Sequence, residues 1–259
     1  MDTSVAHPAR RYNYWLGGKD HFAADRESGD LLAKAFPTAV IAARENRDFL
    51  RRSVRFLAES GVRQFLDIGT GLPVPDNTHE IAQRVAPESR VLYVDNDPIV
   101  MTHSRALTIG TPQGCTGYVE ADLREPEAIL GHDELTAVLD LREPVALLLV
   151  AVLHFIHDDE QAVSVVTRLL DALPSGSYLV ASNLTLDFAP PAQVAKHEEL
   201  LASGRTDARA RNKSEFGRLF GRLELVDPGI VAVSDWRPER SDRPTAEDVA
   251  IYGAVGRKR

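Results

Sequence analysis

Apolar runs of strand length alternate with helical patterns through the middle of the chain. Between residues 62 and 183 there are five such runs: Phe65–Ile68, Val91–Val94, Tyr118–Asp122, Val145–Leu153 and Ser177–Ser182. The run over 145–153 has no polar break, which is typical of a central parallel strand that is covered on both faces. The alternation predicts a doubly wound α/β fold, in which a mostly parallel sheet carries helices on both faces.

The predicted helices lie before, between and after these strands. The clearest spans about 37–60, where Leu50, Val54 and Leu57 share one face. Further helical patterns cover about 77–85, 98–107, 158–173, 191–203 and 213–220. Apolar stretches at Leu223–Val226, Ile230–Val233 and Val249–Val255 close the chain. Because two closing strands have no full helix between them, we expect an antiparallel hairpin at the edge of the sheet.

The loop after the first predicted strand reads Asp67-Ile68-Gly69-Thr70-Gly71. It lacks the third glycine of a dinucleotide-binding loop, since Val74 stands there, and Pro73 and Pro75 each remove a backbone N–H. A pyrophosphate needs such donors at a helix N-terminus. The loop therefore favours a cofactor without phosphate, whose sugar and amino-acid tail the glycines can approach. An NAD-dependent oxidoreductase is the less favoured interpretation.

Acidic residues end three successive predicted strands. Asp67 can accept hydrogen bonds from an ammonium group or order the loop. Asp95 stands where a carboxylate can accept hydrogen bonds from both ribose hydroxyls. Asp122, or the backbone N–H after it, can contact an adenine edge. Each of these residues alone is typical of a turn or a helix cap, but together with the glycine loop they predict a ribose and adenine pocket.

These residues resemble class I S-adenosylmethionine-dependent methyltransferases. Residues 65–71 are similar to the first motif of that superfamily, residues 91–98 to the second, and residues 122–124 to the segment that reads adenine. A narrower similarity is to an actinobacterial S-adenosyl methyltransferase family that was first catalogued as a domain of unknown function. It rests on the segment PARRYNYWLGGKDHFAADR at 8–26, on the pair Asn46-Arg47 and on the loop Gly71-Leu72-Pro73.

The resemblance spans nearly the whole chain and implies a Rossmann-like fold with seven strands, the last of them antiparallel. It implies one structural unit, with a helical cap or lid at 1–60, a methyltransferase domain at 61–259, and a helical insertion near the acceptor site at 184–217. The implied cofactor is S-adenosylmethionine. The residues expected to bind it in the strand-end loops are Asp67, Gly69, Thr70, Gly71, Asp95, Asn96, Asp122 and Leu123.

Four of the 17 aromatic residues lie between Tyr12 and Phe22. They indicate either an aromatic plug between the N-terminal helix and the sheet or a lid over the cofactor. We favour the lid, which would keep water from the sulfonium and place aromatic faces near its charge. In that case Tyr14 and Lys19 are expected to contact the cofactor.

Few side chains are candidates for the chemistry itself. His154 follows the central strand and is the one candidate for a general base, although a histidine packed beneath the cofactor loop is the simpler interpretation. The segment 157–160 fits a capped helix start better than a metal site, so no metal is expected. Cys115 has no support as a nucleophile. Four arginines share one face of the 37–60 helix: Arg44, Arg47, Arg51 and Arg55. They form a solvated basic face, or one of them reaches a ligand carboxylate.

Charge and length narrow the choice of partner. With 30 basic and 38 acidic residues the formal net charge is −8, which argues against a general nucleic-acid binder. A single cysteine excludes an intrachain disulfide, and we find neither a membrane-spanning apolar run nor a secretory signal. We therefore expect a cytoplasmic enzyme that methylates a small molecule by in-line displacement. The alternative is a regulatory protein that binds S-adenosylmethionine or S-adenosylhomocysteine without catalysis.

Overall fold

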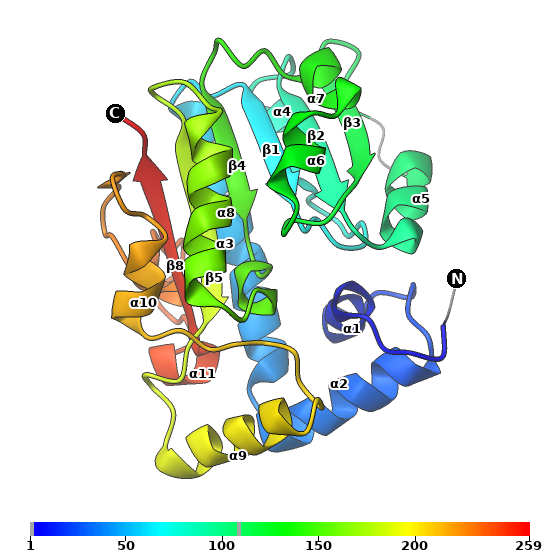
Figure 1. Cartoon of the computed structure of the whole chain (residues 1–259), viewed down its shortest axis with the longest axis vertical. Coiled ribbons are helices and arrows are strands. Elements are labelled where there is room, and N and C mark those ends of the chain that lie inside the picture. Colours follow the sequence, from blue (N-terminus) through cyan, green and yellow to red (C-terminus); the bar gives the residue numbers. More distant parts are fainter. Residues whose placement is uncertain (1–2, 108–109) are drawn as a thin grey trace.

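A computed structural model describes residues 3–107 and 110–259, and one sheet runs through the described part (Figure 1). Its order is β3-β2-β1-β4-β5-β8-β6, and β7 pairs with β8 beyond this path. Its eight strands are β1 Gln64–Ile68, β2 Arg90–Asp95, β3 Cys115–Glu120, β4 Val145–Leu149, β5 Tyr178–Leu184, β6 Glu224–Leu225, β7 Val231–Ala232 and β8 Ile251–Arg257. The first five strands are mutually parallel, as predicted.

The last strands differ in detail from the expected edge hairpin. β8 pairs antiparallel with β5 along its whole length, so it lies inside the sheet. The short strands β6 and β7 pair antiparallel with residues 256–257 and 252–253 of β8. They act as two pieces of one interrupted edge strand, which is why the described chain has eight strands where seven were expected.

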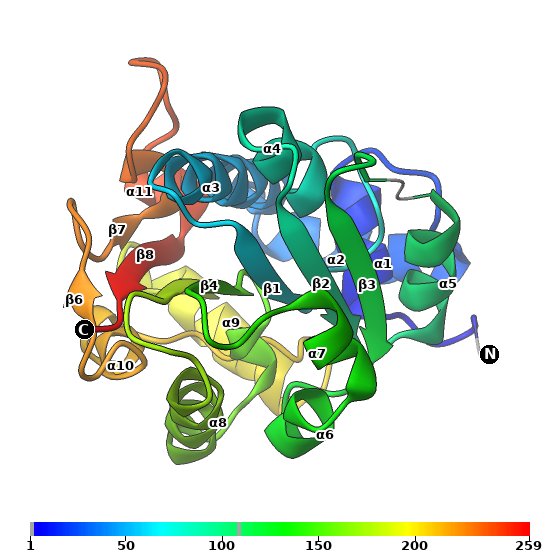
Figure 2. The same ribbon diagram turned by 90° about the horizontal axis from the view of Figure 1, so that it is seen from above.

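Helices cover both faces of the sheet (Figure 2). The helices α3 and α4 lie on one face, and α6, α7 and α8 lie on the other. The α-helices are α1 Pro8–Trp15, α2 Ala23–Ala35, α3 Ala39–Glu59, α4 Thr78–Val85, α5 Pro98–Leu107, α6 Pro126–Leu130, α7 Asp133–Val138, α8 Asp159–Asp171, α9 Pro191–Ala202, α10 Lys213–Arg218 and α11 Ala246–Val249. Two short 3₁₀ turns follow β4 and β7: η1 Leu153–Phe155 and η2 Val233–Asp235.

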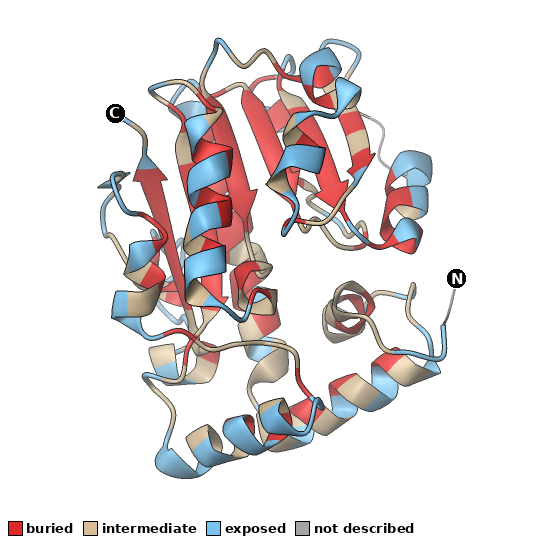
Figure 3. Cartoon of the chain, viewed as in Figure 1, coloured by how far each residue is buried: buried red, intermediate tan, exposed pale blue. Residues whose placement is uncertain are grey.

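Alternating side chains of the strands form two apolar layers. Phe65 of β1 packs with Leu50 and Leu57 of α3 in one layer, whereas Leu66 and Ile68 belong to the layer under α8. Every residue of β1 and β4 is buried (Figure 3). For β4 this confirms the central position predicted from its unbroken apolar run. These two layers hold the carboxyl ends of the strands in fixed positions.

Two predicted strands end before their apolar patterns do. β4 stops at Leu149, and the chain turns at Ala151, which has a φ of +58°, into η1. The Ala151 N–H, which has left the ladder, donates instead to Ser182 Oγ at 2.9 Å. β3 likewise stops at Glu120, so Asp122 lies beyond the strand. In both places the chain leaves the sheet at its carboxyl edge.

The N-terminal helices lie beyond this carboxyl edge, together with α9 (Figure 1). The helices α1 and α2 precede the helix that the sequence predicted over about 37–60, and α2 follows α1 after a short turn. The longer helix α3 runs from this region back along the sheet. None of the helices in residues 3–107 and 110–259 is long and apolar enough to cross a membrane.

Candidate functional site

A cavity of about 820 Å³ opens at the carboxyl ends of β1, β2, β3, β4 and β5. Its walls come from these strand ends, from α1, α2 and α3, from η1, and from α9 and α11. Sites for small ligands have volumes of about 300–1,000 Å³, so this cavity can hold a cofactor and a second molecule together. It lies where open α/β sheets bind their ligands.

The glycine loop forms the floor of one half of the cavity. Gly69 has a φ of +76°, and a Cβ there would lie 2.5 Å from Val152 Cγ2. Gly71 has a φ of +67°, and a Cβ there would meet no atom within 4 Å. Both positions favour glycine because their φ is positive. At Gly69 the close packing of Val152 adds a steric reason, whereas the backbone at Gly71 faces open space.

Asp95, at the end of β2, holds this loop. Its Oδ2 accepts a hydrogen bond from the Gly71 N–H and its Oδ1 one from the Asp97 N–H, both at 2.9 Å. The side chain is buried, and this burial raises its pKa above the ordinary value. Each carboxylate oxygen can accept a second hydrogen bond, so Asp95 retains acceptor capacity toward the cavity.

Asp122 and Asn96 lie next to Asp95 in the lining. Asn96 Nδ2 donates to Asp122 Oδ2 at 3.2 Å. The Arg124 guanidinium donates to the same carboxylate and holds its pKa at about 2. Leu123, which lies between Asp122 and Arg124 in the sequence, is buried and also lines the cavity. The predicted ribose and adenine residues are thus brought together at one end of the cavity.

Asp67, the third acid, is more deeply enclosed. Its Oδ2 accepts a hydrogen bond from Thr78 Oγ1 at 2.6 Å, and burial raises its pKa to about 6. The positive charge of Arg47 opposes that rise. Both Asp67 and Arg47 line the cavity.

The four arginines of α3 have different surroundings. Arg51 and Arg55 form ion pairs with Glu239 outside the cavity, and Arg44 is exposed. Arg47 lines the cavity while its Nη2 donates to the Asp76 backbone oxygen at 2.6 Å. Of the two interpretations, a solvated face describes Arg44, Arg51 and Arg55, and only Arg47 stands where it could meet a ligand.

In the aromatic segment at 12–22, Tyr12 lines the cavity instead of the predicted Tyr14. Tyr12 lines the cavity, its hydroxyl donates to the Ala43 oxygen at 2.8 Å, and it accepts from Asn46 Nδ2 at 3.1 Å. Tyr14 instead donates to Asp30 of α2 at 2.8 Å. Lys19 is exposed. The structure does not bring Tyr14 or Lys19 to the cavity, because α1 turns Tyr12 toward it.

His154 lies on η1 in the other half of the cavity. Burial lowers its pKa to about 4, so the ring is neutral at pH 7 and a weak base. Asp158 caps α8 by accepting from the Gln161 N–H at 2.7 Å, as the sequence predicted. No group of three potential metal ligands occurs in the described ranges 3–107 and 110–259. Cys115 lies at the start of β3 and is not part of the lining.

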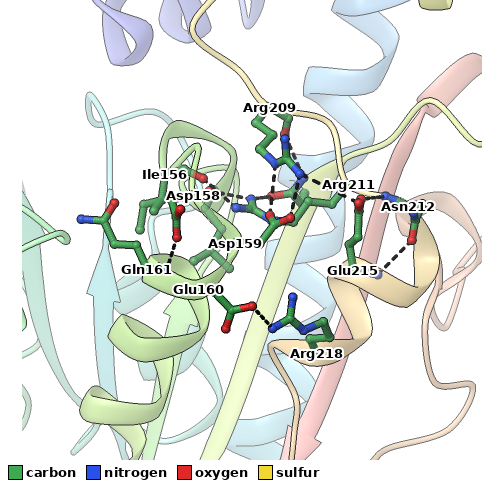
Figure 4. A network of polar contacts seen from close by, with 12 residues as sticks. Ile156, Asp158, Asp159, Glu160, Gln161, Arg209, Arg211, Asn212, Glu215 and Arg218 are labelled. Atoms are coloured by element: carbon green, nitrogen blue, oxygen red, sulfur yellow. Dashed lines mark hydrogen bonds and ion pairs between the residues drawn. The ribbon is translucent and has the colours of Figure 1, made fainter.

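A buried arginine that the sequence did not reveal fixes η1 (Figure 4). Arg211 is 1% exposed and donates to the backbone oxygens of Leu153 and Ile156 at 2.9 and 2.6 Å. Its Nε donates to Asp159 Oδ1 at 2.9 Å, and Asp159 also binds Arg209. The Arg209 N–H donates to the His154 oxygen at 2.7 Å. This network positions the segment that carries His154.

The backbone N–H groups of the glycine loop indicate which kind of cofactor the site can bind. The N–H groups of Gly69 and Thr70 donate to the Val94 oxygen at 2.8 and 3.3 Å, and that of Gly71 donates to Asp95. No loop N–H from 69 to 71 is left for a pyrophosphate, and carboxylates stand beside the loop. This donor set fits a ribose, an adenine and an amino-acid tail without phosphate.

Comparison with known proteins gives the same answer. The profile of a family described as S-adenosyl methyltransferase matches residues 1–259. The fold is similar, with a TM-score of 0.95 and 50% identity over 100% of this chain and 99% of the other, to a DUF574 family protein from Streptomyces avermitilis. A Thermobifida fusca protein whose name proposes a methyltransferase has a TM-score of 0.90 and 42% identity, over 100% and 97% of the two chains.

More distant structures share the fold alone. Human N-acetylserotonin methyltransferase, solved in complex with SAM, has a TM-score of 0.51 and 14% identity, over 98% of this chain and 63% of the other. None of the curated proteins matches the chain. From the family match and the structure, the chain belongs to the S-adenosyl methyltransferase family, with S-adenosylmethionine as its cofactor.

Proposed function

We propose that the protein transfers the methyl group of S-adenosylmethionine to a small-molecule acceptor by in-line displacement. The observation that carries this proposal is that one cavity joins the strand ends of β1, β2 and β3 to the space under α2, α9 and α11. A cofactor and an acceptor would therefore share one enclosure. Alignment of two reactants in such an enclosure can contribute up to roughly 7–11 kcal/mol to catalysis.

The cofactor half is formed by the residues at the ends of β1, β2 and β3. We assign Asp95 to the ribose hydroxyls, and Asn96, Asp122 and Leu123 to the adenine end. Gly69, Thr70 and Gly71 form the loop under the sugar and the tail. The cofactor supplies a methyl group on a positively charged sulfur.

The amino-acid tail has two charged ends, and the cavity has a matching pair. Asp67 carries a carboxylate for the ammonium group, and Arg47 carries a cation for the carboxylate. Both side chains line the cavity, and the positive charge of Arg47 opposes the rise in the pKa of Asp67 that burial causes. This arrangement supports Arg47 as the arginine of α3 that reaches a ligand.

The acceptor half is formed mainly by the N-terminal helices and by residues 184–217. Its lining includes Trp15, Leu32 and Phe36 from the first group, and Leu186, Gln193 and His197 from the second. These walls are mostly apolar and enclosed by helices, which favours a small molecule over a nucleic acid strand.

The proposal can be tested with methyl-labelled cofactor and a small-molecule extract of cells. Purified protein should transfer label to compounds of low mass and form S-adenosylhomocysteine. Calorimetry on the same preparation should show binding of S-adenosylhomocysteine and none of NAD. The Asp95→Ala variant serves as the control that should transfer less label.

Two results would contradict the proposal. Label recovered in protein or nucleic acid would refute a small-molecule acceptor. Tight binding of S-adenosylhomocysteine, without turnover in any extract fraction, would instead favour a regulatory protein that does not catalyse methyl transfer.

A further inference from the structure

Two histidine rings in the acceptor half keep a nitrogen that has no partner among the described residues. His154 lies on η1 and His197 on α9, and both line the cavity. His154 Nδ1 and His197 Nε2 are buried atoms without a hydrogen-bond partner, and the whole His197 side chain is 4% exposed. Because a buried polar atom without a partner is costly, each ring favours a ligand that supplies one.

Both rings are neutral at pH 7, and a neutral imidazole has one nitrogen that accepts a hydrogen bond. Burial lowers the pKa of His154 to about 4 and lowers that of His197 below its usual value. A hydrogen bond with the Ala208 backbone opposes the change at His197, which is the effect of a ring N–H that donates to a carbonyl. The His197 proton then resides on the nitrogen bound to Ala208, and Nε2 is left as an acceptor.

The surroundings of the two rings contain no free positive charge for an anion. Among the described residues, the Arg or Lys side chain in this half is Arg11, which forms an ion pair with Asp207 at 3.0 Å and donates to Ser28. The adjacent lining is apolar and includes Leu32, Phe36, Phe155 and Ile156. The ring of Phe36 packs edge-on to His197, with centroids 6.0 Å apart. An unpaired carboxylate or phosphate would be expensive to bury there.

We propose that the methyl acceptor is an uncharged ring compound with two separate hydroxyl groups, of which one donates to His154 and the other to His197. This inference rests on the proposed function, and it names the class of acceptor. Apolar walls accommodate the ring, and the two unpartnered nitrogens fix its orientation.

The hydroxyl at His154 is the one that receives the methyl group. The reason is its position: η1 follows β4 after a turn of three residues, and Val152 in that turn packs on Gly69 of the cofactor loop. The acceptor oxygen attacks the methyl carbon, the carbon–sulfur bond breaks, and its electron pair stays on sulfur. The hydroxyl proton, made acidic by the new bond, passes to His154 Nδ1 and then to water. His154 is thus a catalytic residue and His197 a positioning residue.

Three naphthalene probes of one shape test the assignment. The full chain, saturated with S-adenosylhomocysteine, is titrated with 2,6-naphthalenediol, with 2-naphthol and with 2,6-naphthalenedicarboxylate. We expect the diol to bind at least about tenfold more tightly than the dicarboxylate. The variant His197→Phe should lower the affinity for the diol about fivefold, which corresponds to one hydrogen bond, and should leave that for 2-naphthol unchanged.

Control variants separate this role from a structural one. His197→Gln keeps a polar group in place of the ring, and His103→Phe changes a histidine on α5 that is not in the lining. His103→Phe should alter no affinity, and each variant should bind S-adenosylhomocysteine like the unmodified protein.

The inference is overturned if the dicarboxylate binds as well as the diol, if neither binds, or if His197→Phe weakens diol and 2-naphthol equally. A protein that does not bind S-adenosylhomocysteine at all would instead refute the proposed function. The titration with S-adenosylhomocysteine, which precedes the titrations with the probes, therefore distinguishes the two failures.

Discussion

The Asp95 carboxylate accepts a hydrogen bond from the Gly71 backbone N–H at 2.9 Å, across 24 positions of the chain. This contact joins the end of β2 to the loop after β1. The residue assigned to the ribose therefore also shapes the loop under the cofactor. The other oxygen accepts a hydrogen bond from the backbone N–H of Asp97, so each carboxylate oxygen has one partner and can accept a second hydrogen bond from a ligand.

Asp95→Ala should weaken binding of S-adenosylhomocysteine at least about tenfold, because hydrogen bonds to a charged acceptor contribute about 1.5–3 kcal/mol each. It should also lower the melting temperature of the ligand-free protein, since the N–H groups of Gly71 and Asp97 lose their acceptor. Asp95→Asn should be less destabilising, because its amide oxygen still accepts. Calorimetry and thermal unfolding measure the two effects.

The matched control is Glu120→Ala. Glu120 lies opposite Asp95 in the register of β2 and β3, but it is exposed and is not part of the lining. It should change neither affinity nor melting temperature. Equal effects of the two alanine substitutions would remove Asp95 from the site.

Asp67→Asn should have opposite effects on stability and on binding. The pKa of this buried carboxyl is about 6, against an ordinary value of 3.8. A native pKa above the unfolded one means that the contribution of Asp67 to stability falls as pH rises from about 4 to about 6. The asparagine variant avoids this loss and should be more stable at pH 7, by up to about 3 kcal/mol, but not at pH 4. Urea unfolding at the two pH values measures this.

The same substitution should weaken cofactor binding, because the ammonium group loses a carboxylate. In the unmodified protein, affinity for S-adenosylhomocysteine should fall as pH drops below about 6, where Asp67 becomes protonated. In Asp67→Asn this dependence should disappear. Asp140→Asn is the control: Arg142 holds the pKa of that exposed carboxyl at about 2, so its removal should give no gain of stability at pH 7. A pH-independent affinity in the unmodified protein would contradict the assignment of Asp67.

Arg211→Met should destabilise the protein by about 3–5 kcal/mol, the range for breaking a buried ion pair. The substitution leaves the Ile156 oxygen without a donor, the Leu153 oxygen with only the Ile156 N–H, and Asp159 with one partner fewer. Arg218→Met is the matched control, because Arg218 and Glu160 form an exposed ion pair that is worth about 0–1 kcal/mol. Denaturant unfolding compares the two variants, and similar losses would show that Arg211 does not stabilise η1.

The sequence predicted best what depends on local pattern. Asp67 and Asp95 lie at the carboxyl ends of short, mostly apolar strands, and the glycine loop directly follows the first of these strands. Their convergence at one sheet edge could therefore be deduced. The apolar run over 145–153 predicted too long a strand, because its residues belong to two different structures. Its first five residues form β4, whereas Val152 packs under Gly69 and Leu153 enters the core outside the strand.

Contacts between distant segments could not be deduced. Arg11 and Asp207 are 196 positions apart, and no spacing in the sequence connects them. Tyr14 was predicted instead of Tyr12 because the sequence does not show which side of this segment faces the cavity. In the helix α1, residues two positions apart point about 200° from each other around the axis, so only one of these tyrosines can face the cavity.

Residues 1–21 should behave as a lid, and their removal tests this against a plug. The contacts of α1 are mainly polar: Arg10 and Arg11 are buried, His7 pairs with Asp97 at 3.1 Å, and Arg11 pairs with Asp207. No aromatic residue of α1 belongs to the three apolar clusters of the described chain. Deletion should therefore leave the melting temperature of the ligand-free protein within a few degrees, whereas a plug of buried aromatics would contribute about 1.5–3 kcal/mol for each side chain. The same deletion should abolish most of the stabilisation by S-adenosylhomocysteine, because that stabilisation follows affinity. A chain that lacks only residues 1–6, which precede α1, is the control.

Hydrogen exchange gives a second test of the lid. Residues 12–22 should gain protection when S-adenosylhomocysteine is added, while the protection of β4 stays unchanged. Full protection of 12–22 in the ligand-free protein would show that the segment is part of the core.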